Sequence, residues 1–103
     1  MSLWRLSLAH YYAFLPTVSV PHKLRSISSE PMLAVTVHNG RSESLQWWWV
    51  NYAGSPVYYS TIRSGSEIIQ LTFATHPWLI TTLSGDLVGV YIPYTANANI
   101  SIE

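Results

Sequence analysis

The sequence has no cysteine and few charged residues. Without cysteine, a disulfide, a thiolate metal site and a cysteine nucleophile are all excluded. Charged residues make up 10% of the 103 positions, and the formal net charge is zero. Proteins bind nucleic acid through a basic surface that displaces counterions, so nucleic acid is not an expected partner. A polybasic membrane-surface mode lacks its cations for the same reason.

Long apolar runs are missing too. No stretch reaches the roughly 18 consecutive apolar residues of a transmembrane helix, so we expect no transmembrane segment. The N-terminal MSLWRLSLAHYYAFL weakly resembles a signal peptide, but His10, Tyr11 and Tyr12 interrupt it and no small-x-small cleavage site follows. We expect residues 1–23 to form an N-terminal extension, disordered or loosely packed, and residues 24–103 to form one domain. A cytoplasmic or nuclear location is expected, with secretion as the alternative.

Patterns that carry catalysis are absent as well. No two of the four histidines have the i,i+2 or i,i+4 spacing of metal ligands, and no GxSxG, P-loop or GxGxxG motif occurs. The acidic residues are scattered and mostly lie beside expected turns: Glu30, Glu43, Glu67, Asp86 and Glu103. We therefore predict a non-enzymatic protein with no cofactor and no metal.

Short stretches of alternating apolar and polar residues fill the chain from about residue 24. Leu33, Val35 and Val37 alternate with smaller or more polar residues, which is typical of a half-buried strand. Turn sequences such as Asn39-Gly40 separate this stretch from others that look alike. The further strands are expected at 45–52, 57–62, 67–73, 78–83, 87–94 and 99–102. The pattern predicts an all-β fold, a small seven-stranded antiparallel β-sandwich.

Strand alternation also assigns side chains to faces, although it leaves the choice of face open. If Trp48 faces the core, Trp49 faces away from it; if Leu71 and Phe73 are core residues, Thr72 faces out between them. The three consecutive tryptophans keep the opposite assignment open, because a one-residue slip exchanges the two faces.

One set of residues on these faces predicts a binding pocket. Two indoles and a phenol, from Trp49, Trp78 and Tyr59, could wall an apolar slot, and Thr72 and His76 could supply its polar contacts. Each residue also has an ordinary interpretation. The tryptophans suit a sheet core, tyrosine and threonine are common strand residues, and a histidine before proline is often a loop residue bonded to backbone.

The order of several sequence pieces resembles a known family. LRSISSEP, VTVHN, WWWVNYAGSPVYY, IRSG, THPW and ANISI follow one another from Leu24 onward. With the spacing W-x4-G…Y…G…H-x-W, the chain resembles the β domain of the von Hippel-Lindau tumour suppressor family over about 80 residues. The combined spacing is far more specific than any one piece.

The resemblance implies a seven-stranded sandwich that captures a hydroxylated proline for substrate recognition by a ubiquitin ligase. In that family the prolyl ring lies among aromatic side chains, and a serine and a histidine bond its hydroxyl. By position, Trp49, Tyr59 and Trp78 match the aromatic wall and His76 matches the histidine, while Thr72 stands where the family usually has serine. The expected partner is a hydroxyproline-containing protein or peptide.

This chain departs from the family in two respects. The family's tumour suppressor carries a helical domain that docks elongin C and recruits a cullin ligase, whereas this sequence ends at Glu103, where the β domain is expected to end. Ser28 and Glu30 also replace polar and basic residues that help hold the longer peptide. We therefore expect a recognition module that does not dock the elongin–cullin ligase directly. The alternatives are a carbohydrate-binding β-sandwich and a structural interaction domain with a disused pocket.

Overall fold

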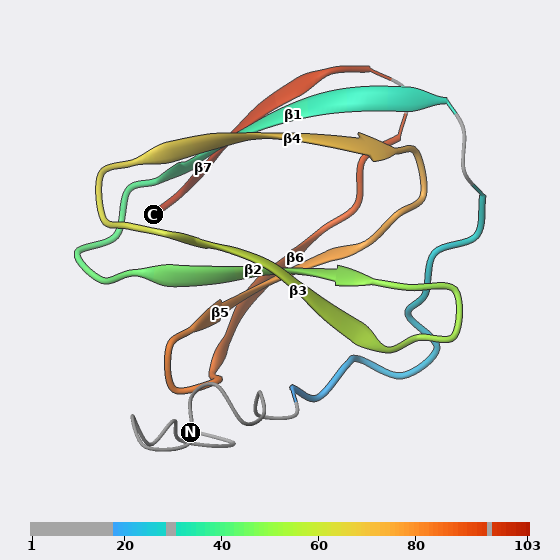
Figure 1. The fold of residues 1–103 in the computed structure, drawn as a ribbon, viewed down its shortest axis with the longest axis horizontal. Coiled ribbons are helices and arrows are strands. Elements are labelled where there is room, and N and C mark those ends of the chain that lie inside the picture. Colours follow the sequence, from blue (N-terminus) through green and yellow to red (C-terminus); the bar gives the residue numbers. More distant parts are fainter. Residues whose placement is uncertain (1–17, 29–30, 95) are drawn as a thin grey trace.

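The computed structural model describes residues 18–28, 31–94 and 96–103, which contain strands and no helix (Figure 1). The seven strands are β1 (Met32–Asn39), β2 (Leu45–Val50), β3 (Pro56–Ile62), β4 (Glu67–Phe73), β5 (Trp78–Thr82), β6 (Leu87–Tyr91) and β7 (Ala98–Ile102). The all-β prediction with seven strands is confirmed. The stretch that resembles a signal peptide lies within residues 1–17, outside the described residues.

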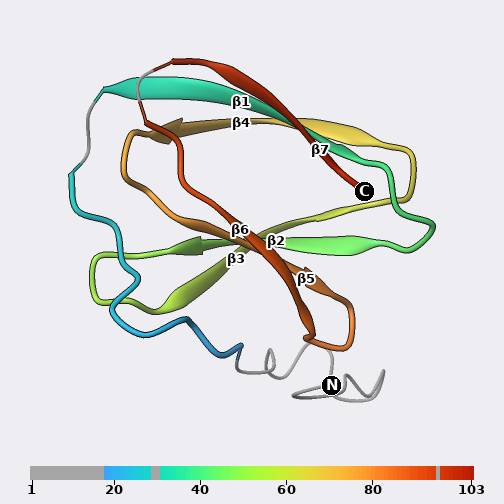
Figure 2. The ribbon, with the colours of Figure 1, turned by 180° about the vertical axis from the view of Figure 1, so that it is seen from behind.

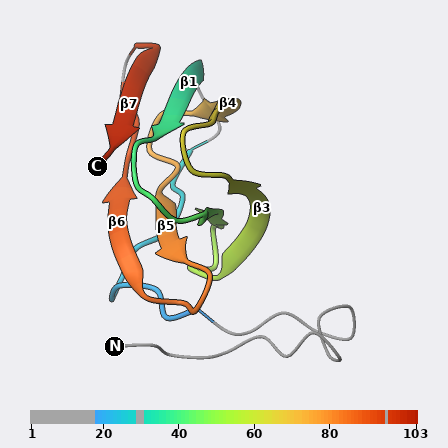
Figure 3. The same ribbon diagram turned by 90° about the vertical axis from the view of Figure 1, so that its left-hand side faces the viewer.

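The strands form two sheets, one of three strands in the order β4-β1-β7 and one of four in the order β3-β2-β5-β6. Figure 3 separates the two layers, with β1, β4 and β7 above β3, β5 and β6. The predicted antiparallel pairing holds for every pair except β1 and β7, which run parallel with Val35 opposite Ala98. The exception arises because the chain passes from β6 in one sheet to β7 in the other (Figure 2), so no hairpin turn imposes an antiparallel partner.

The main core lies between the sheets, where alternation along each strand brings apolar side chains inward. Its buried members are Val35, Val37, Leu45, Trp47, Ile62, Trp78 and Ile80. The rings of Trp47 and Trp78 stack with centroids 4.8 Å apart and planes 9° from parallel. Burying a large apolar side chain of this kind contributes about 1.5–3 kcal/mol, so the stacked pair is a main support of the fold.

The outer face of the four-stranded sheet is also covered. Trp48, Val50 and Leu79 are buried there against Val18, and Val20 packs beside them. The segment that supplies both valines is the blue part of the chain that runs past this sheet in Figure 1. Strand β2 is therefore buried on both faces, which explains three tryptophans in a row. The predicted domain boundary at residue 24 stays a prediction.

The predicted facing of β4 is wrong. Thr72 is 3% exposed, whereas Ile69 and Leu71 are 72% and 63% exposed. Thr72 pairs with the buried Leu33 of β1, and residues directly opposite each other project from the same face of a sheet. The more apolar side of β4 thus faces outward. Thr72 points into the sandwich, toward the end where β2 and β4 finish.

Candidate functional site

All five predicted site residues line one pocket at this end of the sandwich. Trp49 comes from β2, Tyr59 from β3, Thr72 from β4 and Trp78 from β5, while His76 lies in the turn between β4 and β5. Three further residues complete the lining: Tyr52, Leu71 and Phe73. The pocket has a volume of about 210 Å³. Its residues thus come from both sheets, and only the folded sandwich brings them together.

Strand register places the two tryptophans side by side. Trp49 of β2 lies directly opposite Trp78 of β5, so both indoles project from the same face of the four-stranded sheet. This face is the one that carries Trp47 into the core. Trp78 is only 2% exposed and stacks on Trp47, so it is a core residue whose indole also forms part of the pocket wall.

Tyr59 reaches the pocket through an irregularity in β3. Trp47 pairs with Ser60 and Trp48 pairs with Tyr58, so Tyr59 is an extra residue with no partner in the β2–β3 ladder. A bulge of this type bends the strand and turns the extra side chain away from its regular direction. Tyr58 packs with Trp48 on the outer face, and Tyr59 turns to the pocket.

The pocket wall is held by contacts between aromatic rings. Tyr59 meets Trp78 edge-on at a centroid distance of 5.0 Å and Trp49 edge-on at 6.4 Å. The imidazole of His76 stacks on Trp49 at 5.3 Å with planes 22° apart. Edge-to-face and offset stacking are the favoured geometries for such rings, so the wall is built before any ligand arrives.

Hydrogen bonds fix the two indole N–H groups that border the site. Nε1 of Trp78 donates to Oγ1 of Thr72 at 2.9 Å, and Nε1 of Trp49 donates to Oγ of Ser26 at 2.7 Å. The Ser26 hydroxyl in turn donates to the Val50 carbonyl at 2.6 Å. A threonine hydroxyl that accepts one bond still has its own proton to donate. Thr72 therefore presents a hydrogen-bond donor at the pocket.

The turn that carries His76 has an unusual backbone conformation. Thr75 has a φ of 70°, in the left-handed region that a β-branched residue rarely adopts. The N–H of Thr75 donates to the Pro93 carbonyl at 2.9 Å, and its hydroxyl accepts from the Ser28 N–H at 3.2 Å. Strained residues of this kind cost roughly 1–3 kcal/mol and persist where the surroundings hold them. The backbone conformation of Thr75 sets the position of the next residue, His76, and of its imidazole.

The imidazole of His76 is buried, and this burial disfavours its charged form. It is 6% exposed, and this burial lowers its pKa below the ordinary value of 6.5, an effect that a hydrogen bond with the Ser28 backbone partly offsets. Its Nε2 atom lies 3.0 Å from Oη of Tyr52. A neutral imidazole has one donor and one acceptor nitrogen, so the ring can take part in directional recognition of a hydroxyl group.

Sequence reasoning missed Tyr52, Leu71 and Phe73 as lining residues. The strand predicted at 45–52 in fact ends at Val50, and the turn after it carries the Tyr52 ring to the same side as Trp49. The available signal was Gly54, which marks a turn only two residues after Tyr52. Leu71 was missed because the facing of β4 was predicted the wrong way round.

No three histidine, cysteine, aspartate or glutamate side chains among the described residues gather closely enough to hold a metal ion. Within the same ranges there is also no helix with the length and apolarity that crossing a membrane requires.

Comparison with known proteins gives one family match. The family model of the VHL beta domain matches residues 24–88, well over half of the chain. No curated protein matches the sequence. The matched range contains the five predicted site residues and the three added by the structure.

Proposed function

The chain belongs to the VHL β-domain family, and from this premise we propose that it is a protein-binding module whose pocket captures a hydroxylated proline of a partner protein. The observation that carries the proposal is a single pocket lined by aromatic and hydrogen-bonding groups together. The lining residues concerned are Trp49, Tyr59, Thr72, His76 and Trp78.

The size and walls of the pocket suit one small ring. Pockets for drug-sized ligands have volumes of about 300–1,000 Å³, and this one has about 210 Å³. A pyrrolidine ring could pack against the rings of Trp49, Tyr59 and Trp78. The Tyr59 ring stands roughly at right angles to each of the two indoles. The apolar packing would hold proline and hydroxyproline alike, so discrimination has to come from polar groups.

Thr72 supplies one of these polar groups. Its oxygen accepts from Trp78 Nε1 at 2.9 Å, which leaves the hydroxyl proton for a ligand hydroxyl. An unmodified proline would place a methylene against that donor and leave it unpaired. A buried donor without a partner costs about 1–3 kcal/mol, which corresponds to a preference for hydroxyproline of roughly fivefold to a hundredfold or more.

Strand β4 supplies an approach for the rest of the peptide. It is the edge strand of the three-stranded sheet, and its last three residues, Leu71, Thr72 and Phe73, line the pocket. An edge strand presents unpaired backbone N–H and C=O groups, and an extended peptide can add to them as a further strand. We propose that residues flanking the hydroxyproline bind along this edge.

Sugar binding has less support. Proteins that stack sugars on tryptophan need an accessible ring face, whereas Trp78 is 2% exposed and one face of Trp49 is stacked by His76. Tyr59 is 48% exposed but meets both tryptophans edge-on. The placement of these three rings therefore favours peptide binding over sugar binding.

A matched pair of peptide libraries tests the proposed function. Both have random flanks, and the fixed central residue is proline in one and (4R)-hydroxyproline in the other. We expect selective retention of the hydroxylated library and, by calorimetry on one selected peptide pair, at least about tenfold tighter binding of the hydroxylated form. Equal affinity of the two forms, or binding only to neutral glycans on an array, would contradict the proposal.

Variants of Thr72 make the test specific to the pocket. Thr72→Ser keeps the hydroxyl and should keep the preference, whereas Thr72→Val should bring the two affinities together. Thr36→Val is the matched control, because Thr36 lies on the outer face of the three-stranded sheet, opposite the exposed Ile69. A (4S)-hydroxyproline peptide, with its hydroxyl on the other face of the ring, should bind no better than proline.

A further inference from the structure

A third polar side chain reaches the pocket and already bonds to its histidine. Oη of Tyr52 lies 3.0 Å from Nε2 of His76, and both residues line the pocket. The Tyr52 ring meets His76 edge-on at 5.4 Å and Trp49 edge-on at 5.8 Å. Whichever of the two atoms carries the proton, Nε2 of His76 has its partner before a ligand binds.

The backbone beneath Tyr52 is held firmly in place. Oδ1 of Asn51 accepts from the N–H groups of Ala53 and Ser55 at 3.0 and 2.9 Å. The Asn51 N–H donates to the Ser55 carbonyl at 2.9 Å, and its carbonyl accepts from the Gly54 N–H at 3.0 Å.

The conformation of this turn requires a glycine at position 54. Its φ of 82° suits glycine, and a Cβ there would lie 3.2 Å from the Leu24 carbonyl oxygen. Since the turn is fixed in this way, Tyr52 can leave His76 only by a change of its side-chain rotamer. The side chain has room for such a change, because Tyr52 is 47% exposed.

The two polar groups of the pocket therefore differ in what an unmodified proline would do to them. The Thr72 oxygen accepts a hydrogen bond from Trp78, but the proton of the Thr72 hydroxyl would have no acceptor when proline is bound. Nε2 of His76 is bonded to Tyr52, and the ring also has a hydrogen bond with the Ser28 backbone. A bound proline would therefore leave neither of these hydrogen-bonding groups of His76 without a partner. A ligand hydroxyl that reaches Nε2 exchanges one hydrogen bond for another and gains little net free energy.

We propose that Tyr52 is a specificity-determining residue that occupies His76 in the empty pocket and thereby lowers the preference for a hydroxylated over an unmodified proline. The inference rests on the proposed function and adds to it that Thr72 reads the hydroxyl in the natural protein, while His76 does so fully only when the Tyr52 hydroxyl is removed.

Tyr52→Phe tests the inference, because it keeps the ring contacts and removes the hydroxyl. The probes are N-acetyl-(4R)-hydroxyproline methylamide and N-acetyl-proline methylamide, titrated into 15N-labelled protein by NMR, which measures weak binding without knowledge of the partner. We expect the ratio of the two dissociation constants to rise about fivefold or more in Tyr52→Phe. Tyr58→Phe is the matched control, because that hydroxyl bonds Thr61 at 2.6 Å and its ring packs against Trp48 on the outer face.

A second readout needs no ligand. The side-chain 15N resonances of His76 should shift in Tyr52→Phe and stay in place in Tyr58→Phe. If they do not move, the Tyr52–His76 bond is absent in solution and the inference is overturned whatever the binding data show. If they move but the ratio of dissociation constants stays the same or falls, the inference is overturned and the proposed function stands. If neither probe binds to either protein, the proposed function fails and takes the inference with it.

Discussion

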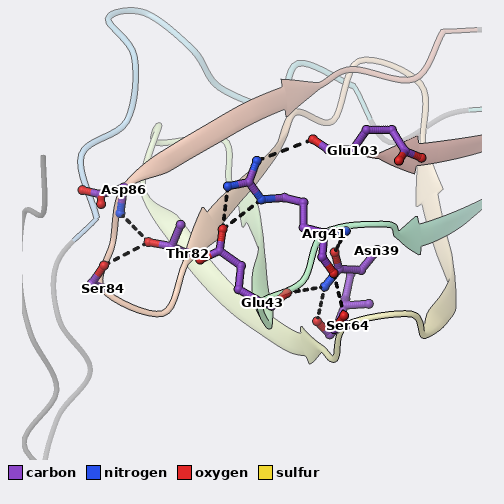
Figure 4. A network of polar contacts seen from close by, with 9 residues as sticks. Asn39, Arg41, Glu43, Ser64, Thr82, Ser84, Asp86 and Glu103 are labelled. Atoms are coloured by element: carbon purple, nitrogen blue, oxygen red, sulfur yellow. Dashed lines mark hydrogen bonds and ion pairs between the residues drawn. The ribbon is translucent and has the colours of Figure 1, made fainter.

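At the end of the sandwich away from the pocket, polar loop groups bond to one another and to backbone, whereas at the pocket end several face a hollow. At the far end the buried Asn39 donates to the carbonyls of Glu43 and Ile62 at 2.8 and 2.9 Å and accepts from the Arg41 N–H at 2.9 Å. Arg41 and Glu43 form an ion pair at 2.5 Å, and Arg41 also reaches the Glu103 carbonyl (Figure 4).

The pocket end also has side chains bonded to backbone, such as Asn51 and Ser26, but other polar side chains there border a cavity. Thr72 keeps a donor toward the hollow, and the half-exposed Tyr52 is the partner of His76 there. The polar groups at the two ends of the sandwich therefore have different roles. Polar groups at the far end close loops, whereas Thr72, His76 and Tyr52 at the pocket end border a cavity that can admit a ligand. Each prediction below bears on this division.

The largest effect is expected for Trp78, which belongs to the core and to the pocket at once. Trp78→Ala removes the stacked partner of Trp47 and the donor to Thr72, so we expect the free energy of unfolding to fall by about 3–5 kcal/mol. Trp49→Ala should cost clearly less, because Trp49 is only half-buried. Urea denaturation of both variants measures the difference. Equal losses would show that Trp78 supports the core no more than Trp49 does.

An intermediate effect is expected at the far end. Asn39→Ala leaves the carbonyls of Ile62 and Glu43 and the Arg41 N–H without this partner, so we expect a loss of about 2–4 kcal/mol in the free energy of unfolding. At a temperature where the variant is folded, its affinity for the hydroxyproline probe should be unchanged. Asn99→Ala, at an exposed position of β7, is the control and should change stability by less than about 0.5 kcal/mol. A change in probe affinity in Asn39→Ala would mean that the two ends are coupled.

The smallest effect is expected from acid. Burial lowers the pKa of His76 in the folded protein, so below about pH 6.5 the unfolded chain binds a proton that the folded protein does not. Stability should therefore decrease as the pH falls through the window between 6.5 and the lowered pKa, and level off below it. Denaturation midpoints between about pH 7 and pH 5 should show a shallower decline in His76→Gln than in the parent protein. His22→Gln, at an exposed position, is the control.

Much of the fold followed from the sequence because strands leave a strong alternating pattern. The expected strand bounds at 67–73 coincide with β4, and Leu33, Val35 and Val37 do face inward. The facing of β4 was predicted wrongly, because its outward side is the more apolar one and alternation alone does not say which side is covered. The parallel pairing of β7 is likewise a property of the chain's path between sheets.

The site residues were found through spacing that resembles the family, and their geometry was not accessible from sequence. Tyr59 has the parity of Val57 and Thr61, so no periodicity argument could place it in the pocket before the bulge was known. Tyr52 was missed because the strand was predicted to run through position 52, two residues beyond its end at Val50. Turns and bulges break the period of two at the positions that matter for the pocket.

The bulge at Tyr59 has a consequence for how this domain can change over time. Removal of that one residue would let Tyr58 and Ser60 follow each other in regular pairing with Trp48 and Trp47. The ladder would become more uniform, and the pocket would lose its phenol wall. Deletion of this one residue would therefore remove one wall of the pocket while both of its tryptophans, Trp49 and Trp78, stay in the chain.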